Sequence, residues 1–186
     1  MISTKHLTPK TDKKLTMKQE KSTLILGIGN YLMGDEGIGV HVANILEKNN
    51  PFEGVDILDG GTGGFHLLEY FEKYEHVILV DATLDGNTPG TIRLIKPRFA
   101  KDFPPAMSTH DIGLKDMICA MQILGNIPEI DLFVVSIESI QQQGIELTPE
   151  IEAVVPAIIE KISELLQNDI QSARLSLSET AEMLVV

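Results

Sequence analysis

Three side chains of the kinds that bind transition metals stand in separate segments of the sequence. Glu36 follows Asp35 in "GDEG", Asp81 stands near the end of "HVILVDAT", and His110 lies in "STHDIGL". Two carboxylates and one imidazole are suitable ligands for nickel or zinc. Each also has an ordinary explanation, because acidic residues are common at helix starts and turns and a lone histidine is most often exposed. The residue types therefore indicate a candidate metal site, which spacing along the chain does not establish.

The sequence contains no evident nucleophile for catalysis. Ser108 and Thr109 precede His110, but neighbours along the chain do not act as nucleophile and base unless the fold brings their atoms together. Cys119 is the only cysteine, so the chain forms no internal disulfide. It lies among apolar residues of a predicted helix, and we expect it to be a small core residue. The catalytic group is thus undetermined, with the three possible metal ligands as its candidates.

A glycine pair after the first apolar segment is typical of the start of a dinucleotide-binding fingerprint. Gly27 and Gly29 fit the Gly-X-Gly turn, whereas Leu32 stands where the third glycine is needed. Asp35 and Glu36 also bring negative charge to the start of the next predicted helix, where a phosphate would otherwise bind. A metal or acid–base site is thus favoured. Two alternatives stay open: a nucleotide- or cofactor-binding module, and an interaction subunit in which these residues only form caps and turns.

Short apolar segments that alternate with helical ones predict the elements that carry these residues. Continuous apolar segments typical of buried strands occupy residues 23–28, 55–58, 76–80, 91–95 and 131–137. Strands that alternate with helices favour right-handed βαβ units. We therefore predict an α/β fold, a three-layer α/β/α sandwich around a mostly parallel twisted sheet of about five strands. In such folds the functional crevice lies beyond the carboxyl ends of the strands, and the candidate ligands stand there.

Apolar residues at helical spacing fill the segments between these strands. They predict helices near residues 38–46, 64–73, 114–121 and 148–166. The last helix begins with Thr148 as N-cap and Pro149 at the first helical position, and we expect Pro156 to kink it. Residues 171–186 have no clear period, and we expect them to fray.

The composition is that of one ordinary globular domain. The chain has 186 residues, of which 43% are hydrophobic and 23% charged, and no apolar stretch approaches the roughly 20 residues that span a bilayer. We divide it into a flexible basic tail at 1–22, an α/β domain at 23–168 and a C-terminal tail at 169–186. The basic tail lacks the apolar region of a signal peptide, which predicts a cytoplasmic protein.

The charge is divided unevenly between the basic tail and the rest of the chain. The net charge of the whole chain is −12 and that of residues 1–22 is +4, which leaves −16 for the remainder. An acidic body repels the phosphates of nucleic acids and attracts a basic protein or peptide. We therefore expect a protein partner and no binding to nucleic acid or membranes.

Five separated motifs carry a resemblance to a known family. They are "GIGNYLMGDEGIGVHV", "ILDGGTGG", "VILVDAT", "STHDIGL" and "GIELTPEIE". In this order and spacing they resemble the motifs of the nickel–iron hydrogenase maturation endopeptidases. The resemblance extends from about residue 23 to residue 166, and the two tails lie outside it.

The resemblance implies a cytoplasmic endopeptidase of the aspartyl type, which removes the C-terminal extension of the hydrogenase large-subunit precursor after nickel has been inserted. It also implies that Glu36, Asp81 and His110 bind this nickel. The metal would be carried by the substrate, so we expect no tightly held cofactor in the protein itself. A metal on the substrate requires no second copy of the protease, so we expect a monomer. The glycine-rich segment 59–65 would let the substrate backbone approach, with Asp59 as a supporting hydrogen-bond acceptor.

Overall fold

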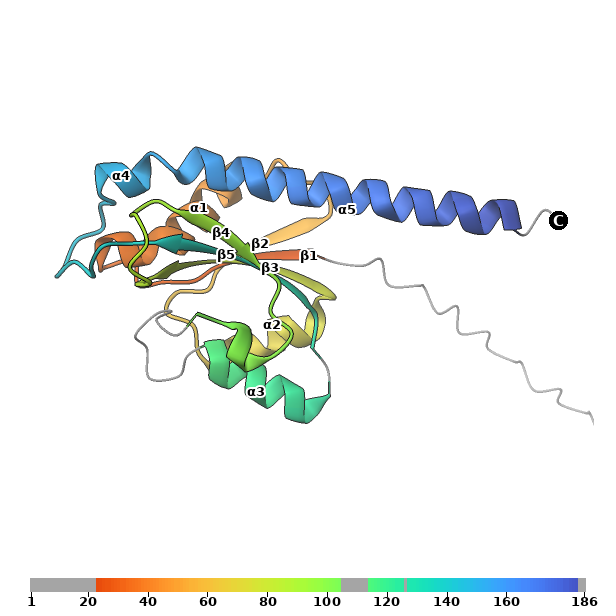
Figure 1. Ribbon diagram of the computed structural model, residues 1–186, viewed down its shortest axis with the longest axis horizontal. Coiled ribbons are helices and arrows are strands. Elements are labelled where there is room, and N and C mark those ends of the chain that lie inside the picture. The colour runs from red at the N-terminus through yellow and green to blue at the C-terminus, as the bar shows by residue number, and fades with distance from the viewer. Residues whose placement is uncertain (1–22, 105–113, 126, 184–186) are drawn as a thin grey trace, which may run out of the picture.

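The computed structural model describes residues 23–104, 114–125 and 127–183, which form a five-stranded sheet with helices on both faces (Figure 1). The strands are β1 (Thr23–Gly27), β2 (Val55–Asp59), β3 (His76–Thr83), β4 (Ile92–Ile95) and β5 (Glu129–Ser136). Their order in the sheet is β2-β1-β3-β5-β4, with β4 antiparallel to β5 and the other pairs parallel. The predicted α/β fold is confirmed, and so are the positions of these five strands.

The helical elements cover this sheet in two layers. They are η1 (Gly34–Gly37), α1 (Ile38–Lys48), η2 (Phe65–Leu67), α2 (Leu68–Lys73), η3 (Ala100–Asp102), α3 (Leu114–Leu124), α4 (Pro149–Glu152) and α5 (Val155–Met183). In Figure 1, α1, α4 and α5 lie on one side of the sheet, and α2 and α3 lie on the other. The predicted three-layer arrangement is therefore present.

Two apolar cores hold the layers together, one on each face of the sheet. Alternate residues of β3 point to opposite faces, so Leu79 packs in the core that includes Phe71 and Met117, from α2 and α3. Val80 packs in the other core, which includes Val42 of α1 and Ile158 of α5. Burial on both faces is the reason why the central strands are continuous apolar segments rather than alternating patterns.

The order of the strands places a topological switch point at the carboxyl ends of β1 and β3. From β1 the chain passes to β2 on one side, and it then returns to β3 on the other side of β1. The segments that leave β1 and β3 therefore diverge, and α/β sheets bind their ligands at such switch points. Glu36 lies in the segment after β1, and Asp81 lies near the end of β3.

β3 and the C-terminal helical segment differ from their predictions. β3 remains paired with β5 as far as Thr83 and Ser136, so Asp81 lies within the strand rather than at its end. The C-terminal segment forms two helices instead of one kinked helix, with the break between α4 and α5. Pro156 is the second residue of α5, where a proline removes no helical hydrogen bond.

The last helix is longer than predicted. α5 continues past residue 168 to Met183, whereas fraying is predicted from residue 171. Leu166 is the last buried residue among its described side chains, and Figure 1 shows the helix projecting beyond the sheet. No helix in the described part of the chain combines the length and apolar character needed to cross a membrane. The basic tail, 1–22, lies outside the described residues.

Candidate active site

Glycines let α1 pack against the ends of two strands at backbone distance. A Cβ atom at Gly39 would lie 2.1 Å from the carbonyl oxygen of Val80 and 2.3 Å from that of Ile28. A Cβ atom at Gly27 would lie 2.0 Å from the carbonyl oxygen of Gly39. Both positions exclude a side chain, so Gly27 serves close packing of helix and strand rather than the approach of a phosphate. This contact holds the segment 28–37 beside the end of β3.

Hydrogen bonds join the segment after β1 to two other loops. The Gly29 N–H donates to the carbonyl oxygen of Gly61, at 2.8 Å. The Gly34 N–H donates to the carbonyl oxygen of Gly144 at 2.8 Å, and the Gly144 N–H donates to that of Leu32 at 2.9 Å. The three loops therefore form one hydrogen-bonded rim at the carboxyl end of the sheet.

Asp35 binds the loop before α4 through its carboxylate. The carboxylate accepts hydrogen bonds from the Thr148 backbone N–H (2.7 Å), the Thr148 hydroxyl (3.0 Å) and the Gln141 side-chain amide (2.6 Å). The Asp35 N–H donates to the side-chain oxygen of Gln141 at 3.0 Å. A simple N-cap role for Asp35 is wrong, since Met33 occupies the cap position of η1 and the Asp35 carboxylate binds Gln141, 106 positions away. Asp35 is thus a structural residue of the rim.

Glu36 and Asp81 are the two predicted ligands among the described residues. Both are buried, with 2% and 0% of their surface exposed, respectively. Glu36 belongs to η1, and η1 contacts the strand β3 that carries Asp81. Asp81 alternates with Val80 along β3 and so points to the face covered by α2 and α3, while one of its oxygens accepts a hydrogen bond from the Ala82 N–H at 2.8 Å. Two carboxylates therefore come from contacting segments at the switch point.

The third predicted ligand, His110, lies outside the described residues, as do Ser108 and Thr109. α3 begins four positions after His110, at Leu114, which is buried in the core on the face to which Asp81 points. Within residues 23–104, 114–125 and 127–183, no group of three His, Cys, Asp or Glu side chains is arranged to hold a metal ion. The described part of the chain thus supplies two of the three predicted ligands.

The glycine-rich segment after β2 forms a tight turn. One carboxylate oxygen of Asp59 accepts a hydrogen bond from the Gly61 N–H at 2.8 Å. Gly61, Gly63 and Gly64 all have positive φ, a conformation that glycine adopts without strain. A Cβ atom at Gly61 would meet nothing within 4 Å, so the outer side of this turn is open. The structure therefore explains these glycines as turn residues, and their contact with a substrate stays a prediction.

Cys119 is exposed, so its prediction as a core residue is wrong. The buried residues of α3 share one face of the helix: Leu114, Met117, Ile118 and Met121. Position 119 falls outside this face, because each residue turns the helix by about 100°. Apolar neighbours in the sequence do not place a helical residue in the core unless they share its face.

His41 connects α1 to the rim, a role that is not predicted from the sequence although it lies within the first motif. Its ring packs against that of Tyr31, with 4.7 Å between the centroids. Burial lowers the pKa of His41 below its ordinary value of 6.5, while a hydrogen bond with the Ile145 backbone and the charges of Asp35 and Glu152 oppose this shift. The ring is therefore mostly neutral at pH 7, and it supports the segment after β1 from the side of α1.

A hollow lies at the carboxyl ends of β3 and β5. Its walls include Leu84, Asn87 and Pro89 after β3, and Ile137 and Glu138 after β5. Apolar and polar side chains both line it, and Glu138 adds a carboxylate. The hollow is thus a surface of mixed polar and apolar character.

The sequence matches known hydrogenase maturation proteins over most of its length. The family model for hydrogenase maturation proteases matches residues 40–165. The hydrogenase 2 maturation protease of Escherichia coli K12 is 34% identical over 147 residues, which cover 77% of this chain and 90% of that protein. The hydrogenase expression/formation protein HupD of Rhizobium leguminosarum bv. viciae is 33% identical over 149 residues, which cover 78% and 74% of the two chains.

Solved structures of such proteases have the same fold. The hydrogenase maturating endopeptidase HybD from Escherichia coli matches with a TM-score of 0.70 and 34% identity, over 80% of this chain and 93% of that one. A nickel–iron hydrogenase maturation protease from Thermococcus kodakarensis KOD1 matches with a TM-score of 0.64 and 27% identity, over 81% and 95%. These matches favour an enzyme over a nucleotide-binding module or a non-catalytic interaction subunit. The chain belongs to the hydrogenase maturation protease family, a family of peptidases.

Proposed function

We propose that this protease removes the C-terminal extension from the large-subunit precursor of a nickel–iron hydrogenase, after nickel has been inserted. Glu36, Asp81 and His110 would bind the nickel ion of the precursor, so the metal is part of the substrate. The observation that carries the proposal is the pair of buried carboxylates, Glu36 and Asp81, on contacting segments at the switch point of the sheet. The histidine ligand would come from outside the described residues.

Buried carboxylates favour a bound cation. The attraction between a carboxylate and a divalent ion is much stronger in a low-dielectric site than in water. Carboxylate oxygens and an imidazole nitrogen are ligands that nickel accepts, and the precursor would supply the remaining ligands. A precursor without nickel would leave two carboxylates at one site with no metal between them, and their mutual repulsion would disfavour that complex. The charge of the site would therefore select the nickel-loaded substrate.

Metal binding would also fix the peptide that is to be cut. The hollow lined by Leu84, Pro89 and Ile137 lies at the same end of the sheet, where the chain leaves β3 and β5, and would hold a further segment of the precursor. A peptide held in one place reacts faster, because the entropy of orienting it is lost on binding rather than in the reaction. The three proposed ligands remain the candidates for the catalytic groups.

The test uses a hydrogenase large-subunit precursor with and without nickel, and it measures the mass of the intact precursor after incubation. We expect loss of the C-terminal extension only from the nickel-loaded precursor. Glu36→Gln, Asp81→Asn and His110→Ala should each reduce the cleavage rate by more than about 100-fold, because each removes a ligand. Glu129→Gln is the acidic control, since Glu129 lies at the start of β5, at the opposite end of the sheet, and it should change the rate much less.

Two results would contradict the proposal. If the three substitutions leave cleavage unaffected, the protein is still a protease, but Glu36, Asp81 and His110 are not its nickel site. Failure to cleave any nickel-loaded precursor, together with thermal stabilisation by a nucleotide at millimolar concentration, would favour the binding module instead.

A further inference from the structure

Three large apolar side chains lie exposed on the loops next to η1. Tyr31 is 39% exposed, Leu32 is 64% exposed and Ile145 is 48% exposed. The two loops that carry them pair through a bridge between Met33 and Gly144, with hydrogen bonds on both sides of it. We call these three residues the apolar platform. Exposed apolar groups that gather on neighbouring loops are typical of interaction sites.

The apolar platform is held in place by buried polar contacts. Asp35 ties the first loop to Gln141 and Thr148, at the two ends of the second loop. His41 supports Tyr31 by ring packing and also bonds to the backbone of Ile145. A surface that is already ordered loses little conformational entropy when a partner binds. The apolar platform is thus already ordered before a partner binds.

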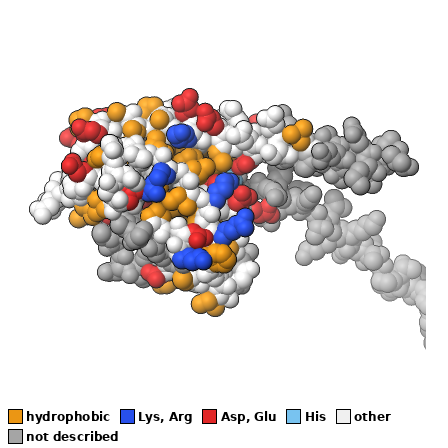
Figure 2. Space-filling model, in the orientation of Figure 1, with side chains coloured by type: hydrophobic (Ala, Val, Ile, Leu, Met, Phe, Trp, Pro, Cys, Tyr) orange, Lys and Arg blue, Asp and Glu red, His pale blue; other side chains and the backbone are white. Residues whose placement is uncertain are grey.

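Acidic residues border the apolar platform. Glu138, Glu146 and Glu150 are exposed in the segment that contains Ile145 and leads into α4. The segments that follow β1, β2, β3 and β5 at this end of the sheet contain no Lys or Arg: 28–37, 60–64, 84–91 and 137–152. In Figure 2 this end, on the left, presents hydrophobic and acidic side chains, whereas Lys and Arg lie nearer the middle of the same face. An apolar centre with an acidic border fits a protein surface whose apolar groups are surrounded by Lys and Arg.

We propose that the apolar platform and its acidic border dock the folded part of the precursor, through an apolar surface bordered by basic side chains. This inference rests on the proposed function, and it assigns the binding of the precursor to residues other than the metal ligands. Leu32 is four positions from Glu36, so a precursor docked on the apolar platform stands beside the nickel site. Docking would then bring the C-terminal segment of the precursor to the site, where Glu36 and Asp81 would recognise the bound nickel.

The first arm of the test replaces apolar side chains of the platform. The double variant Leu32→Gln/Ile145→Gln should bind the nickel-loaded precursor at least about tenfold more weakly than wild type, measured by biolayer interferometry. Its KM should rise with kcat unchanged, because the replaced groups are not placed at the metal. Ile123→Gln/Ile170→Gln is the matched control, since both residues are exposed on α3 and α5, and it should bind within about twofold of wild type.

The second arm reverses charge at the border. Glu146→Lys/Glu150→Lys should lower the association rate by about tenfold at low ionic strength, and the effect should fade in about 0.5 M salt. Glu160→Lys/Glu164→Lys reverses two exposed charges on α5 and should change the rate much less. Melting temperatures of all variants within about 3 °C of wild type would exclude unfolding as the cause.

The outcomes separate this inference from the proposed function. If wild type binds and cleaves the precursor and the platform variants do so equally well, the docking surface is wrong and the protease assignment stands. Equal loss of binding in the control variants would also overturn it. If wild type neither binds nor cleaves any nickel-loaded precursor, the proposed function fails, and the docking partner fails with it.

Discussion

Asp35 and Glu36 are adjacent carboxylates with different surroundings. Asp35 accepts three hydrogen bonds from the loop before α4, and it is 3% exposed. Glu36 is equally buried, but it belongs to the segment that contacts β3 and Asp81. One acid therefore fixes the position of the loop, and this leaves the other as the candidate ligand. The pair "DE" in the sequence does not reveal this division.

Replacement of Asp35 by Asn should destabilise the rim. The amide would place a donor among the N–H and O–H donors of Gln141 and Thr148, so we expect a loss of about 1–3 kcal/mol in the free energy of unfolding. Urea denaturation measures this loss, and hydrogen exchange should be faster at the Gly144 amide, which bonds to Leu32. Glu36→Gln is the matched control and should leave exchange at Gly144 unchanged. Equal exchange rates in both variants would show that Asp35 does not hold the loop.

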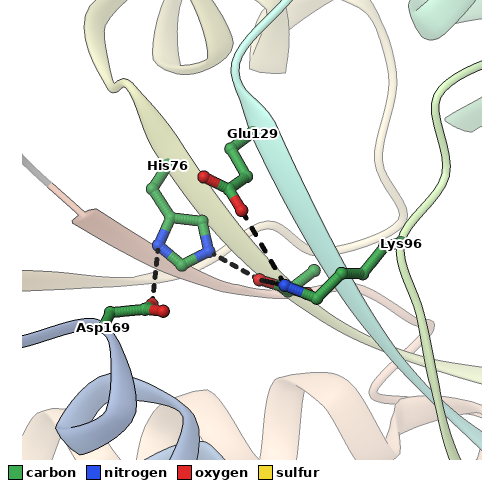
Figure 3. A network of polar contacts seen from close by, with 5 residues as sticks. His76, Lys96, Glu129 and Asp169 are labelled. Atoms are coloured by element: carbon green, nitrogen blue, oxygen red, sulfur yellow. Dashed lines mark hydrogen bonds and ion pairs between the residues drawn. The ribbon is translucent and has the colours of Figure 1, made fainter. Parts of the chain in front are cut away.

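At the level of elements, a polar network joins strands and helix at the opposite edge of the sheet (Figure 3). His76, at the start of β3, lies 2.9 Å from a carboxylate oxygen of Asp131 in β5 and 3.7 Å from one of Asp169 in α5. Lys96, just after β4, lies 3.0 Å from Asp131 and 3.8 Å from Glu129. Burial opposes ionisation of Asp131, but hydrogen bonds from His76 and Lys96 outweigh it and hold its pKa below 3.8. The network holds α5 and the edge strand β4 against the sheet, and it lies far from the candidate active site.

The depressed pKa of Asp131 predicts how stability depends on pH. Its contribution is complete above the unfolded-state pKa of about 3.8 and is lost as the pH falls through the lower folded-state value. Asp131→Asn should therefore cost about 1–3 kcal/mol at pH 7, and the difference from wild type should shrink below about pH 4. Urea midpoints at pH 7, 4 and 3 measure this.

Glu129→Gln is the control for this prediction. Glu129 is exposed, so its substitution should cost less than about 1 kcal/mol. If Asp131→Asn costs the same at pH 7 and at pH 3, the ionised Asp131 carboxylate is not the source of the stability.

At the scale of the whole molecule, α5 divides into a buried part and a projecting part. Ile158, Ile162 and Leu166 pack in the core with α1, whereas the described side chains after Leu166 are exposed, including Ile170. The helix continues beyond the domain boundary predicted at residue 168, although its apolar period does not. The fold therefore depends on the first turns of α5 far more than on its end.

Deletion of residues 170–186 should change the free energy of unfolding by less than about 1 kcal/mol, because it retains the buried residues of α5 and Asp169. Urea denaturation of the shortened chain checks this. A chain that ends at residue 154 is the control, and it should not fold, since it loses Ile158, Ile162 and Leu166. A loss of more than about 2 kcal/mol in the first deletion would assign a structural role to the projecting part.

The α/β class, the five strands and the order of the motifs can all be predicted from the sequence. Burial on both faces of a parallel sheet requires continuous apolar segments, and such segments are visible in the local sequence. The helical spacing of the buried residues in α3 leaves Cys119 outside their face, whereas our prediction followed its apolar neighbours and was wrong. Local patterns report which residues avoid water, and this is enough to locate the elements.

The contacts that hold the loops at the site are visible only in the folded structure. Asp35 meets Gln141 across 106 positions, and β3 extends past Asp81 because β5 lies beside it as far as Ser136. Hydrogen bonds and strand pairing of this kind join residues that are distant in the chain, so no local pattern of hydrophobicity or turn residues contains them.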